Sequence, residues 1–190
     1  MKVFDSGMPE ESYWNSLFDI PSIVDWLEAP SVGEPIVEIG CGYGTFTVPI
    51  ARRTTQVIHA IDIEPSMIEA AKNNARKACV QNVTFRCRDV LAVGTGVPSA
   101  SAGLVLLFNI LHSDERAQFL REASRILGGA GRVAIIHWRK DIPTPRGPAV
   151  ESRPDLQTII DAIAGFDLRV RGEGRVLPPY HWGVQLENRG

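Results

Sequence analysis

Two patterns of apolar residues alternate along this chain: spacing typical of helices, and short apolar runs typical of strands. Their alternation predicts a sheet with helices between its strands. Helical spacing of apolar residues predicts helices at 65–78 and 114–127, and a further helix ends at Ala51. Short apolar runs bounded by glycine, proline or polar residues predict strands at 35–39, 56–61, 83–87, 104–109 and 132–137. This order of elements is typical of a mainly parallel α/β sheet.

Both ends of the chain depart from that alternation. Residues 10–26 are rich in aromatic side chains and helical in pattern, with an interruption at Pro21. This helix either packs its aromatic rings on the sheet or forms a lid over a cleft. Residues 168–176 and 182–186 predict two strands, and the short turn between them favours an antiparallel hairpin. The segments 91–104 and 138–154 are predicted as long loops.

Composition places the chain among single-domain intracellular proteins. Its 190 residues suit one domain, and 20 basic against 22 acidic residues argue against a surface dedicated to nucleic acid or anionic membranes. Three cysteines form no even framework and no Cys-x-x-Cys pair, so nothing suggests secretion or structural zinc. The longest apolar stretch is too short to span a bilayer, and the first residues lack the apolar run of a signal peptide. We therefore expect a cytoplasmic protein without a membrane segment.

A glycine-rich turn follows the strand at 35–39. Gly40, Gly42 and Gly44 open a helix, and the lack of side chains lets backbone N–H groups approach a ligand. Glu38 interrupts the apolar strand, where a bare carboxylate is costly unless it meets a cation or N–H donors. A nicotinamide dehydrogenase is the weakest candidate, because Thr45 stands where the dinucleotide fingerprint needs its third glycine.

Two further acids follow the next strands in order. Asp62 ends the second strand, where a carboxylate accepts hydrogen bonds from both hydroxyls of a ribose in doubly wound folds. Asp89 follows the third strand. Acids at three successive strand ends form a more specific pattern than the glycines alone, and they predict a nucleoside-containing ligand.

With these motifs the sequence resembles the class I S-adenosylmethionine (SAM) dependent methyltransferases, particularly the type 11 group that includes quinone methyltransferases. The resemblance covers residues 35–140, and it implies that Glu38 lies near the SAM amino group. It implies that Asp62 holds the ribose, and that Asp89 takes the adenine amine. The remaining positions that it implies for the cofactor are Gly40, Cys41, Gly42, Gly44, Ile63, Met67, Val90 and Phe108.

The resemblance also implies the fold class: an α/β, Rossmann-like doubly wound domain. We expect a mainly parallel seven-stranded sheet with a C-terminal antiparallel hairpin, in a single domain over 1–190. Within it, 1–30 would be a helical lid and 31–190 the core. One departure from the family pattern is Gly103, which replaces the usual acid just before the fourth strand.

Two histidines follow apolar strands at the edge of the sheet where ligands of open α/β folds bind. His112 is our catalytic candidate, and His137 is the alternative general base, since imidazole titrates near neutral pH. His181 begins the last strand and is expected to be structural. No spacing of His, Cys and acidic residues suggests a metal site.

We therefore expect a SAM-dependent methyltransferase that releases S-adenosylhomocysteine (SAH) and methylates a small molecule, with no nucleic-acid partner, as a monomer or homodimer. Two alternatives stay open: methylation of RNA or protein, and a SAM-binding regulatory protein without catalysis. Basic residues in the loop 138–154 form either a solvated face or an anion-binding rim. They are Arg139, Lys140, Arg146 and Arg153.

Overall fold

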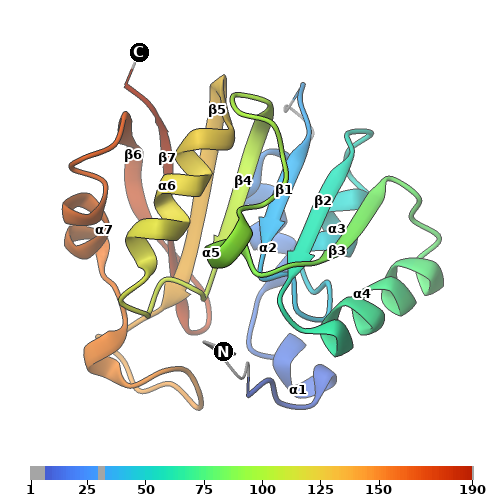
Figure 1. Cartoon of the computed structure of the whole chain (residues 1–190). Coiled ribbons are helices and arrows are strands. Elements are labelled where there is room, and N and C mark those ends of the chain that lie inside the picture. The colour runs from blue at the N-terminus through green and yellow to red at the C-terminus, as the bar shows by residue number, and fades with distance from the viewer. Residues whose placement is uncertain (1–6, 30–32, 190) are drawn as a thin grey trace.

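Seven strands form the sheet in the computed structural model, which describes residues 7–29 and 33–189 (Figure 1). Their spatial order is β3-β2-β1-β4-β5-β7-β6, with β1 to β5 parallel and β7 antiparallel to both of its neighbours. This confirms the Rossmann-like prediction with a C-terminal hairpin. The strands are β1 Ile36–Ile39, β2 Ile58–Asp62, β3 Val83–Cys87, β4 Ala102–Phe108, β5 Leu127–Trp138, β6 Leu168–Leu177 and β7 His181–Asn188.

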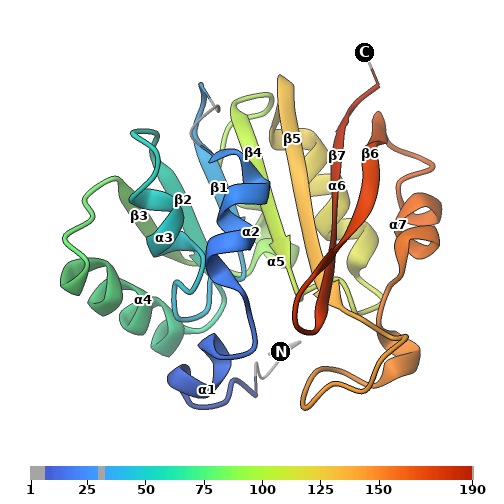
Figure 2. The ribbon, with the colours of Figure 1, turned by 180° about the vertical axis from the view of Figure 1, so that it is seen from behind.

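Helices cover both faces of this sheet, as Figures 1 and 2 show from opposite sides. The helices α2, α3 and α4 lie on one face and α5, α6 and α7 on the other, while α1 lies near the carboxyl ends of the parallel strands. The helices are α1 Glu11–Asn15, α2 Ile20–Leu27, α3 Thr47–Ala51, α4 Pro65–Lys77, α5 Val90–Val93, α6 Arg116–Ile126 and α7 Leu156–Ala162, with a 3₁₀ turn at Val150–Ser152.

The central strands are apolar on both sides because each side meets a helix layer. In β1, Ile36 packs in the cluster that contains α2 and α3, whereas Val37 and Ile39 pack in the cluster that contains α6. Every residue of β4 is buried. The ends of these strands are therefore held rigidly, which suits them to carry a binding site.

The helices differ from the sequence prediction in two boundaries and in two additional helices. The N-terminal helix breaks at residues 16–19, because the Asp19 side chain caps α2 and Pro21 fits its first turn. Helix α6 begins at Arg116 and has no side-chain cap, so Asp114, the first residue of the predicted helix 114–127, neither belongs to the helix nor caps it. Helices α5 and α7 were not predicted; α5 occupies the start of the expected loop 91–104.

Gly103 lies where the register between β4 and β5 shifts, between Ala102 and Leu104. Its N–H donates to the Pro35 carbonyl at 2.9 Å, so this residue of β4 is paired on the β1 side. The missing acid of the family pattern thus coincides with an irregularity at the start of the strand, away from its carboxyl end.

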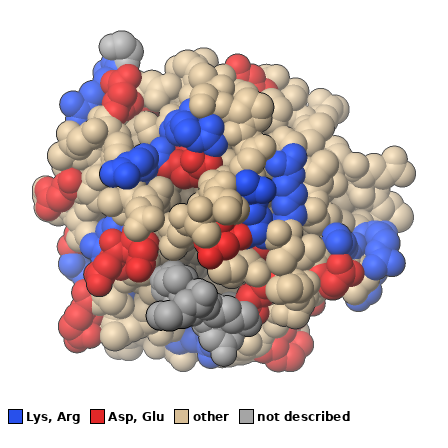
Figure 3. Space-filling model, viewed as in Figure 1, with Lys and Arg blue, Asp and Glu red and all other residues tan. Residues whose placement is uncertain are grey.

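Charged side chains of both signs are interspersed on the face shown in Figure 3. Within residues 7–29 and 33–189, no helix has the length and apolar character needed to cross a membrane.

Candidate active site

A cavity of about 510 Å³ lies at the carboxyl ends of the parallel strands. It extends from the end of β3 across β2, β1 and β4 to the end of β5, the crevice where ligands of doubly wound folds bind. The sequence-predicted residues that line it are Gly40, Cys41, Gly42, Asp62, Ile63, Met67, Asp89, Val90, Phe108 and His112.

The glycine turn between β1 and α3 has the backbone geometry that its sequence predicts. Gly40, Gly42 and Gly44 have φ angles of +79°, +51° and +76°, a region that other residues rarely adopt. A Cβ atom on Gly40 would lie 2.9 Å from the Ile110 Cγ2 atom. The turn is fixed to β2, because the N–H groups of Gly40 and Cys41 both donate to the Ile61 carbonyl, at 2.7 and 3.0 Å. Its exposed backbone therefore faces the cavity in a fixed position.

Two predicted cofactor residues do not line the cavity. Glu38 is 1% exposed and accepts a hydrogen bond from the Thr47 hydroxyl, which ties β1 to the start of α3. A Cβ on Gly44 would lie 3.3 Å from the Ala71 Cβ, so this glycine lets the turn pack against α4. In this structure both residues shape the turn from behind.

Asp62 joins the glycine turn to the end of β2. One carboxylate oxygen accepts from the Gly42 N–H at 2.8 Å, and the other accepts from the Glu64 N–H at 2.9 Å. Burial raises the pKa of Asp62 above its usual range, and these two donors oppose the shift. The carboxylate thus holds the turn and borders the cavity at the same time.

Asp89 caps the short helix α5, whose first residue Val90 also lines the cavity. Its carboxylate accepts from the N–H groups of Leu91 and Ala92, at 3.0 and 3.1 Å. The cap fixes the direction of the chain where it leaves β3.

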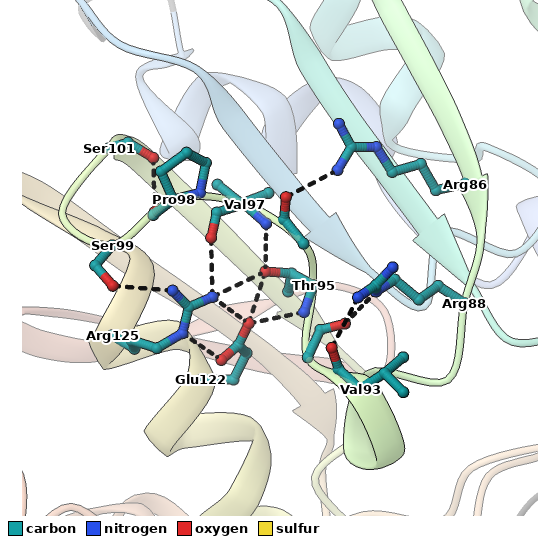
Figure 4. Close-up of polar contacts among 12 residues, drawn as sticks. Arg86, Arg88, Val93, Thr95, Val97, Pro98, Ser99, Ser101, Glu122 and Arg125 are labelled. Carbon is teal, nitrogen blue, oxygen red and sulfur yellow. Dashed lines mark hydrogen bonds and ion pairs between the residues drawn. The ribbon is translucent and has the colours of Figure 1, made fainter.

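The segment after α5 is attached to α6 by a polar network (Figure 4). Glu122 accepts from both the N–H and the hydroxyl of Thr95, each at 2.7 Å, and pairs with Arg125 at 2.7 Å. Burial alone would raise the pKa of Glu122, but Arg125 and Thr95 together lower it to about 2. The network fixes the segment after α5 against α6, next to the cavity-lining residues Val90 and Leu91 of α5.

The two candidate bases lie differently at the other end of the cavity. His112 lines it, and burial lowers the pKa of this histidine, as does the charge of Arg116, while a backbone hydrogen bond with Asn109 opposes the shift. His137 is 0% exposed and does not line the cavity; its ring centroid lies 5.8 Å from that of His112. Of these two histidines, His112 is therefore the one that borders the cavity. His181, as expected, is buried at the start of β7 and stacks on Phe18.

Sequence reasoning named ten of the 26 lining residues as site candidates and left the other sixteen unassigned. Among these sixteen, Trp14 belongs to the aromatic N-terminal helix, whose role was left open between packing and a lid, and Trp138 is the first residue of the predicted loop 138–154. Asn109, with a left-handed backbone (φ +57°), directly follows the predicted site residue Phe108. Arg146 comes from the loop between β5 and α7.

The basic residues of that loop are mostly engaged within the protein. Arg139 pairs with Asp141 at 2.6 Å, Lys140 pairs with Asp155, and Arg153 donates to the Arg139 carbonyl at 2.7 Å. Only one of the four cations, Arg146, lines the cavity, and its guanidinium donates to the Gly7 carbonyl. The hypothesis of an anion-binding rim is therefore not supported by this arrangement.

Among the described residues, no group of three or more His, Cys, Asp or Glu side chains converges in a way that could hold a metal ion. The arrangement thus offers organic ligands a glycine turn, two carboxylates and an apolar wall.

Comparison with known proteins relates this site to a family. The chain is 31% identical over 112 residues to the aklanonic acid methyltransferase DauC of a Streptomyces species, covering 57% of this chain and 50% of that protein. It is 30% identical over 117 residues to the 27-O-demethylrifamycin SV methyltransferase of Amycolatopsis mediterranei, covering 60% and 42%. The chain thus spans about half the length of these curated relatives.

The fold has a solved counterpart in a SAM-dependent methyltransferase from Aquifex aeolicus, with a TM-score of 0.77, 21% identity and 93% coverage of both chains. The sequence model of the methyltransferase domain matches residues 36–131, which are half of this chain and contain the glycine turn and all three strand-end acids. On that match the chain belongs to the methyltransferase domain family, the SAM-dependent class that its motifs resemble.

Proposed function

We propose that this protein transfers a methyl group from SAM to a small-molecule acceptor bound in the same cavity. The observation that carries the proposal is the continuous cavity between two unlike walls. One wall consists of the glycine turn with Asp62 and Asp89, and the other contains Phe108 and His112.

The first wall fits SAM. The turn presents backbone rather than side chains, and a Cβ on Gly40 would fill the space beside Ile110. Asp62 and Asp89 supply carboxylate acceptors for hydroxyl and amine groups, while Ile63 and Met67 supply an apolar surface for a purine. Glu38 would act from behind the turn, through the position of β1 and α3.

When bound, SAM supplies a methyl group whose carbon–sulfur electron pair passes to sulfur as a lone pair of the acceptor forms the new bond. The protein's part is to hold the acceptor in line and to keep water out. We assign to His112 the role of accepting the acceptor's proton, because it lines the cavity and burial lowers the pKa of its imidazole, which favours the neutral form.

A small acceptor suits the cavity better than RNA or protein does. The cavity is covered by the N-terminal segment, since Met8 and Trp14 line it together with the strand ends. The charges on the face shown in Figure 3 are mixed, whereas RNA favours a basic surface. The two relatives named above are, by name, methyltransferases of aklanonic acid and of a rifamycin.

Calorimetric titration with SAM, SAH and NAD tests the proposal, with Asp62→Asn as the site variant. We expect SAM and SAH to bind the wild type in the micromolar range, and NAD not to bind. Asp62→Asn should weaken SAH binding about 10- to 100-fold, because it removes a charged acceptor and loosens the Gly42 N–H.

Asp167→Asn is the matched control, since Asp167 is exposed and is not among the residues that line the cavity. The SAH affinity of this variant should equal that of the wild type. Binding of NAD without SAM or SAH would overturn the proposal. SAM binding without turnover of any acceptor in a small-molecule screen would instead favour the regulatory alternative.

A further inference from the structure

The cavity is longer than its cofactor wall, and its second half is aromatic. Four rings line this half: Trp14, Phe46, Phe108 and Trp138. We propose that it binds an uncharged, planar aromatic acceptor that carries a hydroxyl group, and that the Asn109 amide holds this hydroxyl. This inference rests on the proposed function, which assigns the other half to SAM.

The sheet order separates the two halves. Gly40, Asp62 and Asp89 follow β1, β2 and β3, which are neighbours on one side of the sheet centre. Asn109 follows β4, and Trp138 ends β5, on the other side. The two ligands would therefore lie side by side along the strand ends and meet at the boundary between β1 and β4.

The aromatic rings support one another and form a rigid surface. Phe46 contacts Phe108 edge-to-face at 4.9 Å and Phe18 at 5.1 Å, measured between ring centroids. Phe18 contacts Trp14 at 5.0 Å, and Trp14 contacts Trp138 at 6.3 Å. A surface that is already ordered loses little entropy on binding, and flat rings match it better than flexible chains do.

Asn109 is a polar residue of this wall whose side-chain amide lacks a partner in the described part of the chain. Neither amide atom has a hydrogen-bond partner among the described residues, although both atoms are buried. Its left-handed backbone (φ +57°) is fixed by an N–H bond to the Ile136 carbonyl at 2.8 Å. Such an unsatisfied amide in a cavity wall is costly, and a ligand can relieve the cost. A hydroxyl is a matching ligand, because it donates to the amide oxygen or accepts from the amide nitrogen.

The cations of the lining favour an uncharged acceptor. Among the described lining residues these are Arg88 and Arg146. Arg88 donates to the Val93 carbonyl at 2.8 Å, and Arg146 donates to the Gly7 carbonyl. Arg88 directly follows β3, on the cofactor side, and a phosphate or carboxylate in the aromatic half would have to compete with the Gly7 carbonyl for the donors of Arg146.

Titration of the protein saturated with SAH tests this inference, using 2-naphthol, decahydro-2-naphthol and 2-naphthyl phosphate as probes. The first two share a carbon skeleton and a hydroxyl, but only 2-naphthol is planar and aromatic. We expect 2-naphthol to bind at least tenfold more tightly than either of the others. Equal affinities, tighter binding of the phosphate, or no binding of 2-naphthol would overturn the inference.

Variants locate the binding. Trp14→Leu and Asn109→Gly should each weaken 2-naphthol binding about tenfold and leave SAH affinity unchanged; glycine accepts the left-handed backbone of residue 109. Trp182→Leu is the matched control, because Trp182 is half-buried like Trp14 but lies outside the cavity lining. Binding of 2-naphthol that is unaffected by Trp14→Leu would contradict this assignment alone. Failure of SAH itself to bind would contradict the proposed function first.

Discussion

Glu38 shows how burial changes the chemistry expected of a single residue. An acid within an apolar strand suggests an ionised group that faces a ligand, but the structure places Glu38 against Thr47 behind the glycine turn. Burial raises the pKa of this carboxyl to about 8; the Thr47 hydroxyl opposes the shift, and the charge of Asp62 adds to it. At neutral pH the group is therefore mostly protonated.

This raised pKa predicts a pH dependence of stability. From about pH 4.5 to about pH 8 the folded protein binds a proton at Glu38 that the unfolded chain releases, so the contribution of Glu38 to the free energy of unfolding falls as pH rises through this range. In urea denaturation, the change in the free energy of unfolding from pH 5 to pH 8 should be more positive in Glu38→Gln than in the wild type by roughly 2–4 kcal/mol.

Comparison with the variant isolates this effect from the histidines, because burial lowers their pKa values in the folded protein and their opposite contribution is the same in both proteins. Glu173→Gln, at an exposed position of β6, should keep the pH profile of the wild type. Parallel profiles of the wild type and Glu38→Gln would mean that Glu38 is ionised in the folded protein.

At the scale of elements, the β1–α3 turn was predictable because its conformation requires glycine. The strand-end acids were predictable because a charged residue stands out next to an apolar strand. Helix α7 was not predicted because it has only seven residues and follows a proline-rich loop, so its apolar pattern is too short to recognise. Its stability comes from packing Ile159 into the core. The break before α2 depends on the Asp19 cap, which competes with the continuous helical pattern.

Gly40→Ala tests the geometry of this turn. The substitution forces a left-handed alanine with its Cβ 2.9 Å from Ile110, so we expect a loss of about 1–2 kcal/mol in stability. SAH affinity should fall at least tenfold, because the turn shifts where its backbone faces the cavity. Gly165→Ala is the control, as a Cβ there meets nothing within 4 Å. Wild-type SAH affinity in Gly40→Ala would show that the turn does not contact the ligand.

At the scale of the whole molecule, the cavity combines segments that lie far apart in sequence. The strand ends were predictable from local patterns, and so were ten of the lining residues. The covering residues were not, because their position depends on contacts such as Tyr43 Oη to the Pro9 carbonyl, at 2.7 Å. No local pattern records a contact between positions 34 residues apart. The predicted lid role of the N-terminal helix stays a prediction.

One contact closes the cover from the opposite side. Arg146 donates to the Gly7 carbonyl, which links the loop after β5 to the N-terminal segment across the cavity. On the side of the glycine turn, two hydrogen bonds already hold this segment. The Tyr43 hydroxyl donates to the Pro9 carbonyl and the Thr45 hydroxyl donates to the Asn15 side-chain oxygen, each at 2.7 Å. Arg146→Met keeps the apolar stem and removes the charged donor, so it should release only the far side.

If closure retains the ligand, Arg146→Met should speed SAH dissociation about 3- to 10-fold, as expected for the loss of one charge-assisted hydrogen bond. Hydrogen exchange at residues 7–15 should rise in the same variant. Stopped-flow displacement of SAH measures the first effect, and exchange mass spectrometry measures the second. Arg139→Met alters the same loop outside the cavity, and should change neither. Faster exchange at residues 7–15 with an unchanged dissociation rate would show that closure of this segment does not retain the ligand, because the segment would then open without releasing SAH.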